Sequence, residues 1–218
     1  MLGPLHSRSY ISKEYNQRRA FVSERWAGFS MLEMVIVLAI SMTLMAIASP
    51  YIMGVVYGMR VRYSTYEISS LLQRSRIESV RRNTFYSVQR APTPAGAPVS
   101  YYADFGKNST VLPSDPIAPL GTNVNVAFGV GSGAPGEGAF LGALGYAVNG
   151  AAVLPTFNAR GLPCTVVGNT CPETPGQGFV YFLSNNSMPG NTLWAAVTVT
   201  PSGRVQVWTY DGAAWNQQ

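Results

Sequence analysis

The residues that usually carry acid–base or metal chemistry are scarce along this chain of 218 residues. Its sole histidine is His6, so a Ser/His/Asp set or a histidine metal site has no raw material downstream. The Gly-rich stretch GVGSGAPGEG (129–138) lacks the Lys and Ser/Thr of a phosphate-binding loop. No fixed spacing pairs the carboxylates after residue 59, which are Glu67, Glu78, Asp104, Asp115, Glu137, Glu173 and Asp211. We therefore expect no enzymatic activity, no metal site and no cofactor.

One further carboxylate, Glu33, lies inside an apolar run, AGFSMLEMVIVLAI (27–40). No residue from Met34 to Met59 is charged, and 26 residues of α-helix are about 39 Å long, enough to cross a hydrocarbon core of about 30 Å. Five basic residues precede the run, namely Arg8, Lys13, Arg18, Arg19 and Arg25. The positive-inside rule then predicts a single span with a cytoplasmic N-terminus and an extracytoplasmic remainder.

Three interpretations fit this run. It is a secretory signal cleaved at Ala46-Ile47-Ala48, a plain uncleaved anchor, or a helix whose chain is cut between Gly28 and Phe29. The third interpretation explains Glu33, which becomes the fifth residue of the mature chain. A carboxylate in the first helical turn lies near the interface and favours the positive end of the helix macrodipole. In a bundle of such helices it can pair with the terminal ammonium of a neighbouring subunit.

The segment from Gly28 to Glu33, followed by MVIVLAI and by Pro50, resembles the class III signal of type IV pilins and type II secretion pseudopilins. This resemblance implies that a membrane-embedded prepilin peptidase cleaves between Gly28 and Phe29 and that Phe29 is N-methylated. It also implies that Glu33 and Pro50 serve assembly. Within a membrane span the backbone groups freed by Pro50 can be satisfied locally, so a kink in the helix is expected there. The implied partners are the prepilin peptidase, the inner membrane and other pilins or pseudopilins in a filament.

The stretch from Arg60 to Asn83 contains neither Gly nor Pro, which predicts that the helix continues beyond the membrane. The apolar residues that recur at helical spacing are Val61, Ile68, Leu71 or Leu72, Ile77 and Val80, and the face with Ile68, Leu72, Ser75 and Ser79 is expected to pack on the globular part. Arg74, Glu78 and Arg82 lie four residues apart, which predicts an exposed face with salt bridges. Residues 60–90 hold seven arginines against Glu67 and Glu78, typical of a solvated helix face or of a nucleic-acid patch.

After Asn83 the apolar pattern changes to alternation, which is typical of β-strands. Strands are expected in TFYSVQ, VSYYADF, VNVAFGV, VLPTFNARGLPC, GFVYFLSN, LWAAVTVT and GRVQVWTY, with a hairpin turn at Pro201-Ser202-Gly203. The segments APTPAGAP, PSDPIAP and GSGAPGEG have the composition of loops. Cys164 and Cys171 are seven residues apart, so we expect a local disulfide if the domain is exported.

The segments FNARGLP and AVTVTPSGRVQVW resemble the C-terminal signature of GspH-type pseudopilins and FimT/FimU-type minor pilins. Some FimT-like proteins bind DNA through a Gly-Arg-x-Arg element. This chain has Arg204 at the first arginine of that element and Gln206 at the second. Because affinity for phosphates depends on the number of cations, the substitution weakens the prediction of DNA contact by Arg204.

Together these features predict an α+β, pilin-like fold in which a long, partly transmembrane N-terminal helix packs on an antiparallel β-sheet domain. The expected organisation is a leader peptide (1–28), a transmembrane half of the helix (29–58), an extracytoplasmic half with the first strand (59–90) and a globular β domain (91–218). The expected function is a minor pilin or pseudopilin, a structural subunit of a type II secretion pseudopilus or type IV pilus. The expected location is the bacterial inner membrane, with the C-terminal domain in the periplasm. A DNA-binding minor pilin is the alternative.

Overall fold

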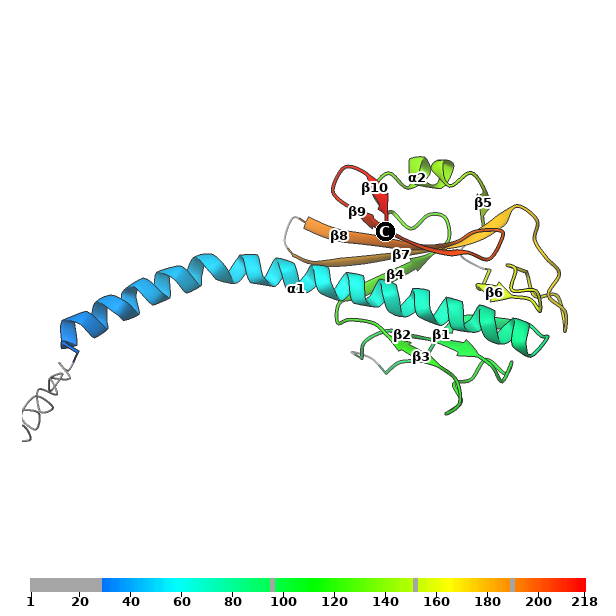
Figure 1. Ribbon diagram of the computed structural model, residues 1–218, viewed down its shortest axis with the longest axis horizontal. Coiled ribbons are helices and arrows are strands. Elements are labelled where there is room, and N and C mark those ends of the chain that lie inside the picture. Colours follow the sequence, from blue (N-terminus) through cyan, green and yellow to red (C-terminus); the bar gives the residue numbers. More distant parts are fainter. Residues whose placement is uncertain (1–28, 95–96, 151–152, 189–190) are drawn as a thin grey trace, which may run out of the picture. The chain divides into compact units, whose positions relative to one another are not determined.

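The computed structural model describes residues 29–94, 97–150, 153–188 and 191–218. A single long helix, α1 (Met31–Arg81), precedes all of the strands (Figure 1). The chain divides between Ala48 and Ser49 into two compact units, so α1 begins in the first unit and ends in the second. Ser30 caps the start of α1, because its Oγ accepts a hydrogen bond from the backbone N of Leu32 at 3.3 Å.

The C-terminal half of α1 packs on the sheets through the predicted face. Ile68, Leu72, Ser75 and Ser79 are all buried. The prediction that Ile77 belongs to the apolar face is wrong, since its side chain is 64% exposed. At about 100° per residue, a position nine residues after Ile68 lies on the opposite side of the helix. Val80 is also exposed, at 49%.

Helix α1 ends in a Schellman motif, the hydrogen-bonding pattern of a helix closed by one left-handed residue. Asn83 has φ +49°, and its backbone N donates to the carbonyl of Val80 at 3.2 Å. The backbone N of Thr84 donates to the carbonyl of Ser79 at 3.0 Å. This cap turns the chain directly into the first strand.

Two antiparallel sheets follow the helix. The smaller has the order β3-β2-β1-β6, and its strands are β1 (Tyr86–Arg90), β2 (Ser100–Asp104), β3 (Ile117–Pro119) and β6 (Thr156–Phe157). The larger has the order β10-β9-β8-β7-β4, and its strands are β4 (Val124–Phe128), β7 (Gln177–Met188), β8 (Asn191–Val199), β9 (Val205–Tyr210) and β10 (Trp215–Gln217). The short β5 (Ala147–Val148) pairs in parallel with β7. The α+β class is confirmed.

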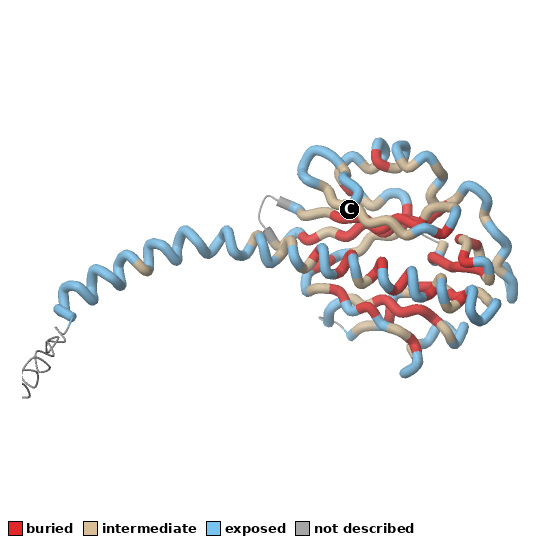
Figure 2. The backbone as a smooth tube through the Cα atoms, viewed as in Figure 1, coloured by how far each residue is buried: buried red, intermediate tan, exposed pale blue. Residues whose placement is uncertain are grey.

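Strand β7 lies between two apolar clusters and therefore carries apolar residues on both faces. Phe179, Tyr181 and Leu183 belong to the cluster shared with α1 and the smaller sheet. Val180 and Phe182 face the other way, where Phe140 of α2 (Glu137–Ala143) covers the larger sheet. Buried backbone accordingly runs through the centre of the second unit in Figure 2.

Four elements of the second unit are not among those that the sequence predicts. PSDPIAP, which has the composition of a loop, contains the edge strand β3, and GSGAPGEG leads into α2. The other two are β5, which pairs with β7, and β10, which pairs with β9 at the C-terminus. The expected strand in VLPTFNARGLPC is only the two residues of β6, and the strand expected in VNVAFGV ends at Phe128.

Candidate functional site: the apolar helix segment and an arginine junction

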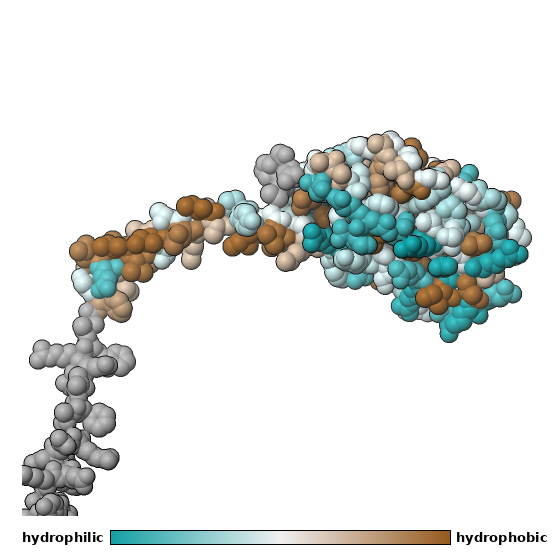
Figure 3. All heavy atoms as spheres, turned by 45° about the horizontal axis from the view of Figure 1, so that its top comes forward, coloured by the Kyte–Doolittle hydropathy of each residue, from teal (hydrophilic) through white to brown (hydrophobic). Residues whose placement is uncertain are grey.

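The N-terminal part of α1 is apolar on every side and exposed. Figure 3 shows apolar side chains along this segment, and all large hydrophobic residues from Met31 to Val56 are at least 39% exposed. Within the described residues α1 is the one helix long and apolar enough to span a membrane. Two hydroxyls near the middle of the segment are satisfied within the helix, since Ser41 donates to the carbonyl of Val37 at 2.7 Å and Thr43 to that of Ile40 at 2.8 Å. A helix of this kind needs lipid or other apolar helices around it.

The predicted processing and assembly residues lie at the start of this segment. Gly28 falls outside the described residues, and Phe29 is 73% exposed immediately before the helix cap. Glu33 lies in the first turn of α1, where the free backbone N–H groups favour a negative charge. Its carboxylate forms no ion pair within the described part of the chain. Pro50 lies inside α1, which continues through it as α-helix.

The two segments of the predicted C-terminal signature meet at α1, around Arg76. Arg76 Nε donates a hydrogen bond to the carbonyl of Gly161, in FNARGLP, at 3.0 Å. A Cβ placed on Gly203, in the β8–β9 turn, would overlap that same carbonyl and would lie 3.0 Å from Arg76 Nε. Both glycines have positive φ, +73° and +78°. The close approach and the backbone conformation together explain why glycine occupies both positions.

We call Arg76, Arg160 and Arg204 the arginine junction, because Arg76 lies on α1 and the other two are next in sequence to Gly161 and Gly203, the glycines that meet it. Arg204 is exposed beside Gly203, and its backbone N donates to Thr200 Oγ1 at 3.0 Å within the β8–β9 turn. Arg160 precedes Gly161 and pairs with Glu173 at 2.9 Å. Sequence reasoning selected Arg204 and missed the other two members. The one sequence signal for this meeting was the glycine in each of the two C-terminal motifs, Gly161 in FNARGLP and Gly203 in AVTVTPSGRVQVW.

The predicted exposed ion pairs of α1 are confirmed in part. Glu78 pairs with Arg82 at 3.2 Å and with Arg81 at 2.9 Å. The guanidinium of Arg74, which was expected to join this network, forms no ion pair within the described residues. Burial opposes ionisation of Glu78, but the hydrogen bonds and charges of the two arginines together lower its pKa.

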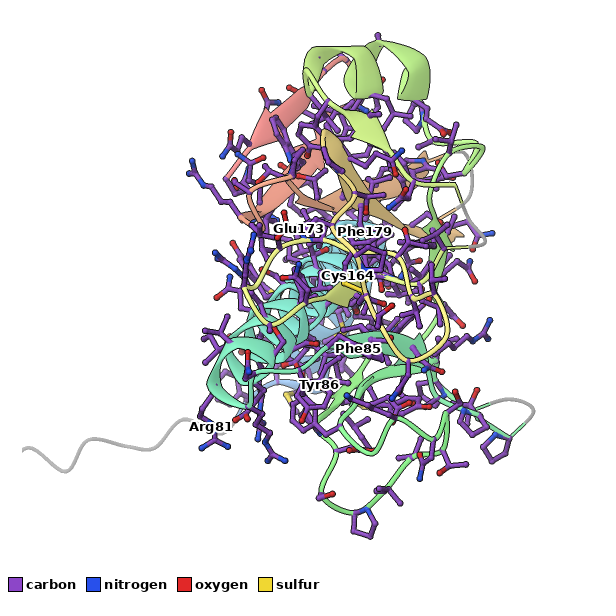
Figure 4. All side chains as sticks on the ribbon, turned by 90° about the vertical axis from the view of Figure 1, so that its right-hand side faces the viewer. Arg81, Phe85, Tyr86, Cys164, Glu173 and Phe179 are labelled. Carbon is purple, nitrogen blue, oxygen red and sulfur yellow. A yellow bond between two sulfur atoms is a disulfide. The ribbon has the colours of Figure 1, made fainter. Side chains whose placement is uncertain are left out.

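A disulfide joins Cys164 and Cys171, as predicted. The loop that it closes borders an open cleft, whose lining includes Asn83 and Thr84 directly after α1. Figure 4 views this end of the second unit, with Cys164 between Glu173 and Phe85. Phe85 and Lys107 lie on the opposite wall, and the Lys107 ammonium lies 4.1 Å from the centroid of the Phe85 ring. Arg160 and Glu173 extend the polar lining of the cleft.

Several carboxylates of the second unit hold loops in place. Asp104 accepts hydrogen bonds from the backbone N of Ser109 at 2.9 Å, and Asp115 accepts one from that of Leu112 at 2.9 Å. Glu137 gathers the Gly-rich loop before α2, with bonds from Gly131 N at 2.6 Å and Ser132 Oγ at 2.9 Å. Among the described residues no three His, Cys, Asp or Glu side chains cluster as metal ligands would.

Comparison with protein families, curated proteins and solved structures finds no match for this chain. The architecture, a long N-terminal apolar helix followed by antiparallel sheets, is consistent with the pilin-like fold that the sequence predicts.

Proposed function

We propose that the protein is a minor pilin or pseudopilin, a structural subunit of a type II secretion pseudopilus or a type IV pilus. One observation carries the proposal. Helix α1 is apolar all round and exposed in its N-terminal part, has Glu33 in its first turn, and packs on antiparallel sheets through its C-terminal part. Such a helix suits both storage in a bilayer and packing against identical helices.

In this proposal the precursor enters the bacterial inner membrane with its N-terminus in the cytoplasm and residues 59–218 in the periplasm. Prepilin peptidase removes residues 1–28, and the new N-terminal Phe29 is methylated. The Glu33 carboxylate then pairs with the terminal ammonium of a neighbouring subunit, where the low dielectric makes an unpaired charge costly. Apolar contacts between the helices supply the rest of the driving force for filament growth.

The first test is the N-terminus of the mature protein. The full chain, expressed with a prepilin peptidase and purified from membranes, is expected to begin at N-methylated Phe29. A chain that begins at Ser49 identifies a secretory signal, and a chain that retains Met1 with the peptidase present identifies a plain anchor. Gly28→Leu is the matched control, because a bulky side chain before the cleaved bond is expected to leave the precursor uncut.

The arginine junction favours one second candidate, a minor pilin that binds DNA. Arg204 is exposed and directly follows Gly203, whose turn lies against Arg76 on α1, so its charge is displayed where the two C-terminal segments meet the helix. Gel retardation of DNA by the full chain in neutral detergent tests this at low salt, where phosphate contacts are strongest. Arg204→Gln should weaken binding and lower the salt slope by about one counterion, whereas Arg74→Gln should not. No retardation by the unaltered chain ends this candidate.

A further inference from the structure

One loop and the first residues of β8 meet α1 at the same level in the second unit. The backbone N of Gly121, in the β3–β4 loop, donates to Ser64 Oγ at 2.8 Å, and a Cβ on Gly121 would lie 3.0 Å from Arg60 Cβ. Leu193, near the β7–β8 turn, has its Cδ1 4.0 Å from a Cβ placed on Gly58. We call this surface the base: residues 57–62 of α1, the loop 120–123 and the β8 residues 192–193.

The base also marks where α1 changes from exposed to buried. Val61 is the first buried residue of the helix, and the apolar side chains that precede it in this unit, such as Ile52 and Val55, are exposed. The folded part of the second unit therefore begins where the uncharged stretch from Met34 to Met59 ends.

The charged side chains of the base are all positive. No carboxylate occurs in residues 34–66, 116–136 or 174–210, which include all segments of the base. Its charged residues are Arg60 and Arg62, and neither forms an ion pair within the described part of the chain. The Arg60 guanidinium carbon lies 5.6 Å from the centroid of the Tyr57 ring, so this side chain reaches back toward the apolar segment.

The length of the helix places these arginines at a defined depth if α1 spans a bilayer. Arg60 follows Glu33 by 27 residues, which as α-helix are about 40 Å long. A bilayer with its headgroup layers is about 40 to 45 Å thick. With Glu33 at one interface, Arg60 and Arg62 therefore reach the headgroup layer of the other leaflet.

We propose that the base rests on the membrane surface and that Arg60 and Arg62 bind the phosphates of anionic phospholipids. This inference depends on the membrane span of the proposed function. Tyr57 and Tyr63 lie three residues before and after Arg60 on α1, and aromatic residues with a polar tip favour this interface. A second copy of the chain is a poor occupant, because its base offers two more arginines and no acid.

The test places fluorescent labels at two positions of the base, one in the loop 120–123 and one at the start of β8. The full chain carrying Thr122→Cys or Thr192→Cys, labelled at the new thiol, is reconstituted into vesicles that contain a headgroup-linked quencher. The vesicles are phosphatidylcholine alone or equal parts phosphatidylcholine and phosphatidylglycerol. Both labels are expected to be quenched, and more strongly with phosphatidylglycerol. A label at Thr110→Cys is the matched control and should stay unquenched, since its loop also holds Lys107, beside the end of α1.

Neutral variants then test the arginines. Each cation near an anionic surface contributes about fivefold to its attraction, so Arg60→Gln with Arg62→Gln should abolish the effect of phosphatidylglycerol while the chain stays inserted. Arg74→Gln should leave the increase in quenching by phosphatidylglycerol unchanged. The proposal is overturned if the labels at positions 122 and 192 are quenched no more than the label at position 110. It is also overturned if their quenching changes neither with phosphatidylglycerol nor with the two arginine substitutions. If the labels become protected from the quencher as the protein-to-lipid ratio rises, a second copy of the chain covers the base, and this result overturns the proposal as well. A chain that resists reconstitution and is extracted by alkaline carbonate contradicts the membrane span itself, and with it the proposed function.

Discussion

Glu33 is the one charged residue in a helical segment that is otherwise apolar as far as Met59. If its carboxylate pairs with a terminal ammonium in a filament, removing the charge leaves that ammonium unpaired at a cost of about 3 to 5 kcal/mol. We therefore expect Glu33→Gln to reduce incorporation into filaments more than tenfold while leaving the amount of protein in membranes unchanged. The measurement compares sheared filaments with the membrane fraction. Glu67→Gln, on the same helix beyond the span, serves as the control, and wild-type assembly by Glu33→Gln would remove the proposed role.

Gly203 is a second residue whose identity the structure requires. It has φ +78°, and its missing side chain makes room for the Gly161 carbonyl that Arg76 binds. Gly203→Ala should destabilise the second unit by about 2 to 3 kcal/mol, since the left-handed conformation alone costs an alanine about 1 to 2 kcal/mol. Gly212→Ala is the control, because Gly212 has φ +102° but open space around it. Denaturant unfolding of the full chain in detergent measures both, and equal losses would show that the close approach contributes nothing.

At the scale of elements, one face of α1 joins the helix to the sheets. Leu72 is fully buried among the residues shared by both sheets, whereas Ile77 is 64% exposed on the opposite side of the helix. Leu72→Ala should destabilise the second unit by about 2 to 5 kcal/mol, whereas Ile77→Ala should change its stability by less than about 0.5 kcal/mol. Thermal unfolding followed by near-UV circular dichroism compares the two. A large loss from Ile77→Ala would contradict the observed packing face.

The turn between β9 and β10 depends on one carboxylate. Asp211 accepts hydrogen bonds from the backbone N of Ala214 at 2.8 Å and of Ala213 at 2.9 Å, and these bonds lower its pKa. A lowered pKa in the folded state means that its stabilising effect is present above the ordinary pKa of about 3.9 and is lost as pH falls through the lowered value. Asp211→Asn should therefore lower Tm near neutral pH, and its Tm should converge with that of the unaltered protein in acid. A difference in Tm that is constant from pH 7 to acid would exclude this linkage.

Some elements could be predicted because their local sequence agrees with the fold. β7, β8 and β9 alternate or run apolar over enough residues, and Pro201-Ser202-Gly203 marks the turn between two of them. β3 was missed because Pro116 precedes it and Pro119 is its last residue, and an edge strand tolerates proline where it makes no ladder bond. The helix α2 was missed because only tertiary packing of Phe140 holds its seven residues.

The candidate site was predictable only where its residues are close in sequence. The segment from Gly28 to Glu33 is a contiguous pattern, and Cys164 and Cys171 are close enough to pair locally. The arginine junction joins three segments that are far apart in the chain, and no periodicity or spacing reports such a meeting. The meeting of Gly161 and Gly203 at Arg76 therefore could not be predicted without the fold.

For the whole molecule, the disulfide connects stability to the compartment in which the second unit folds. The small loop closed by Cys164 and Cys171 should contribute about 2 to 3 kcal/mol through the entropy of the unfolded chain. The double variant Cys164→Ala/Cys171→Ala should lose that amount in denaturant unfolding, and the unaltered protein should lose it when a reductant is added. Reductant should have no effect on the double variant, which controls for other actions of the reagent. Equal stability of oxidised and reduced protein would rule out a structural contribution from this bond.

The intrinsic fluorescence of the tryptophans monitors one side of the second unit. Trp194, Trp208 and Trp215 all lie in the cluster that α2 covers, and the remaining tryptophan, Trp26, belongs to the segment that leader removal would discard. Intrinsic emission of a processed chain would then come from that side alone. A partner that bound there would shift the spectrum, while events at α1 or at the smaller sheet would have to be followed through tyrosine or an added dye.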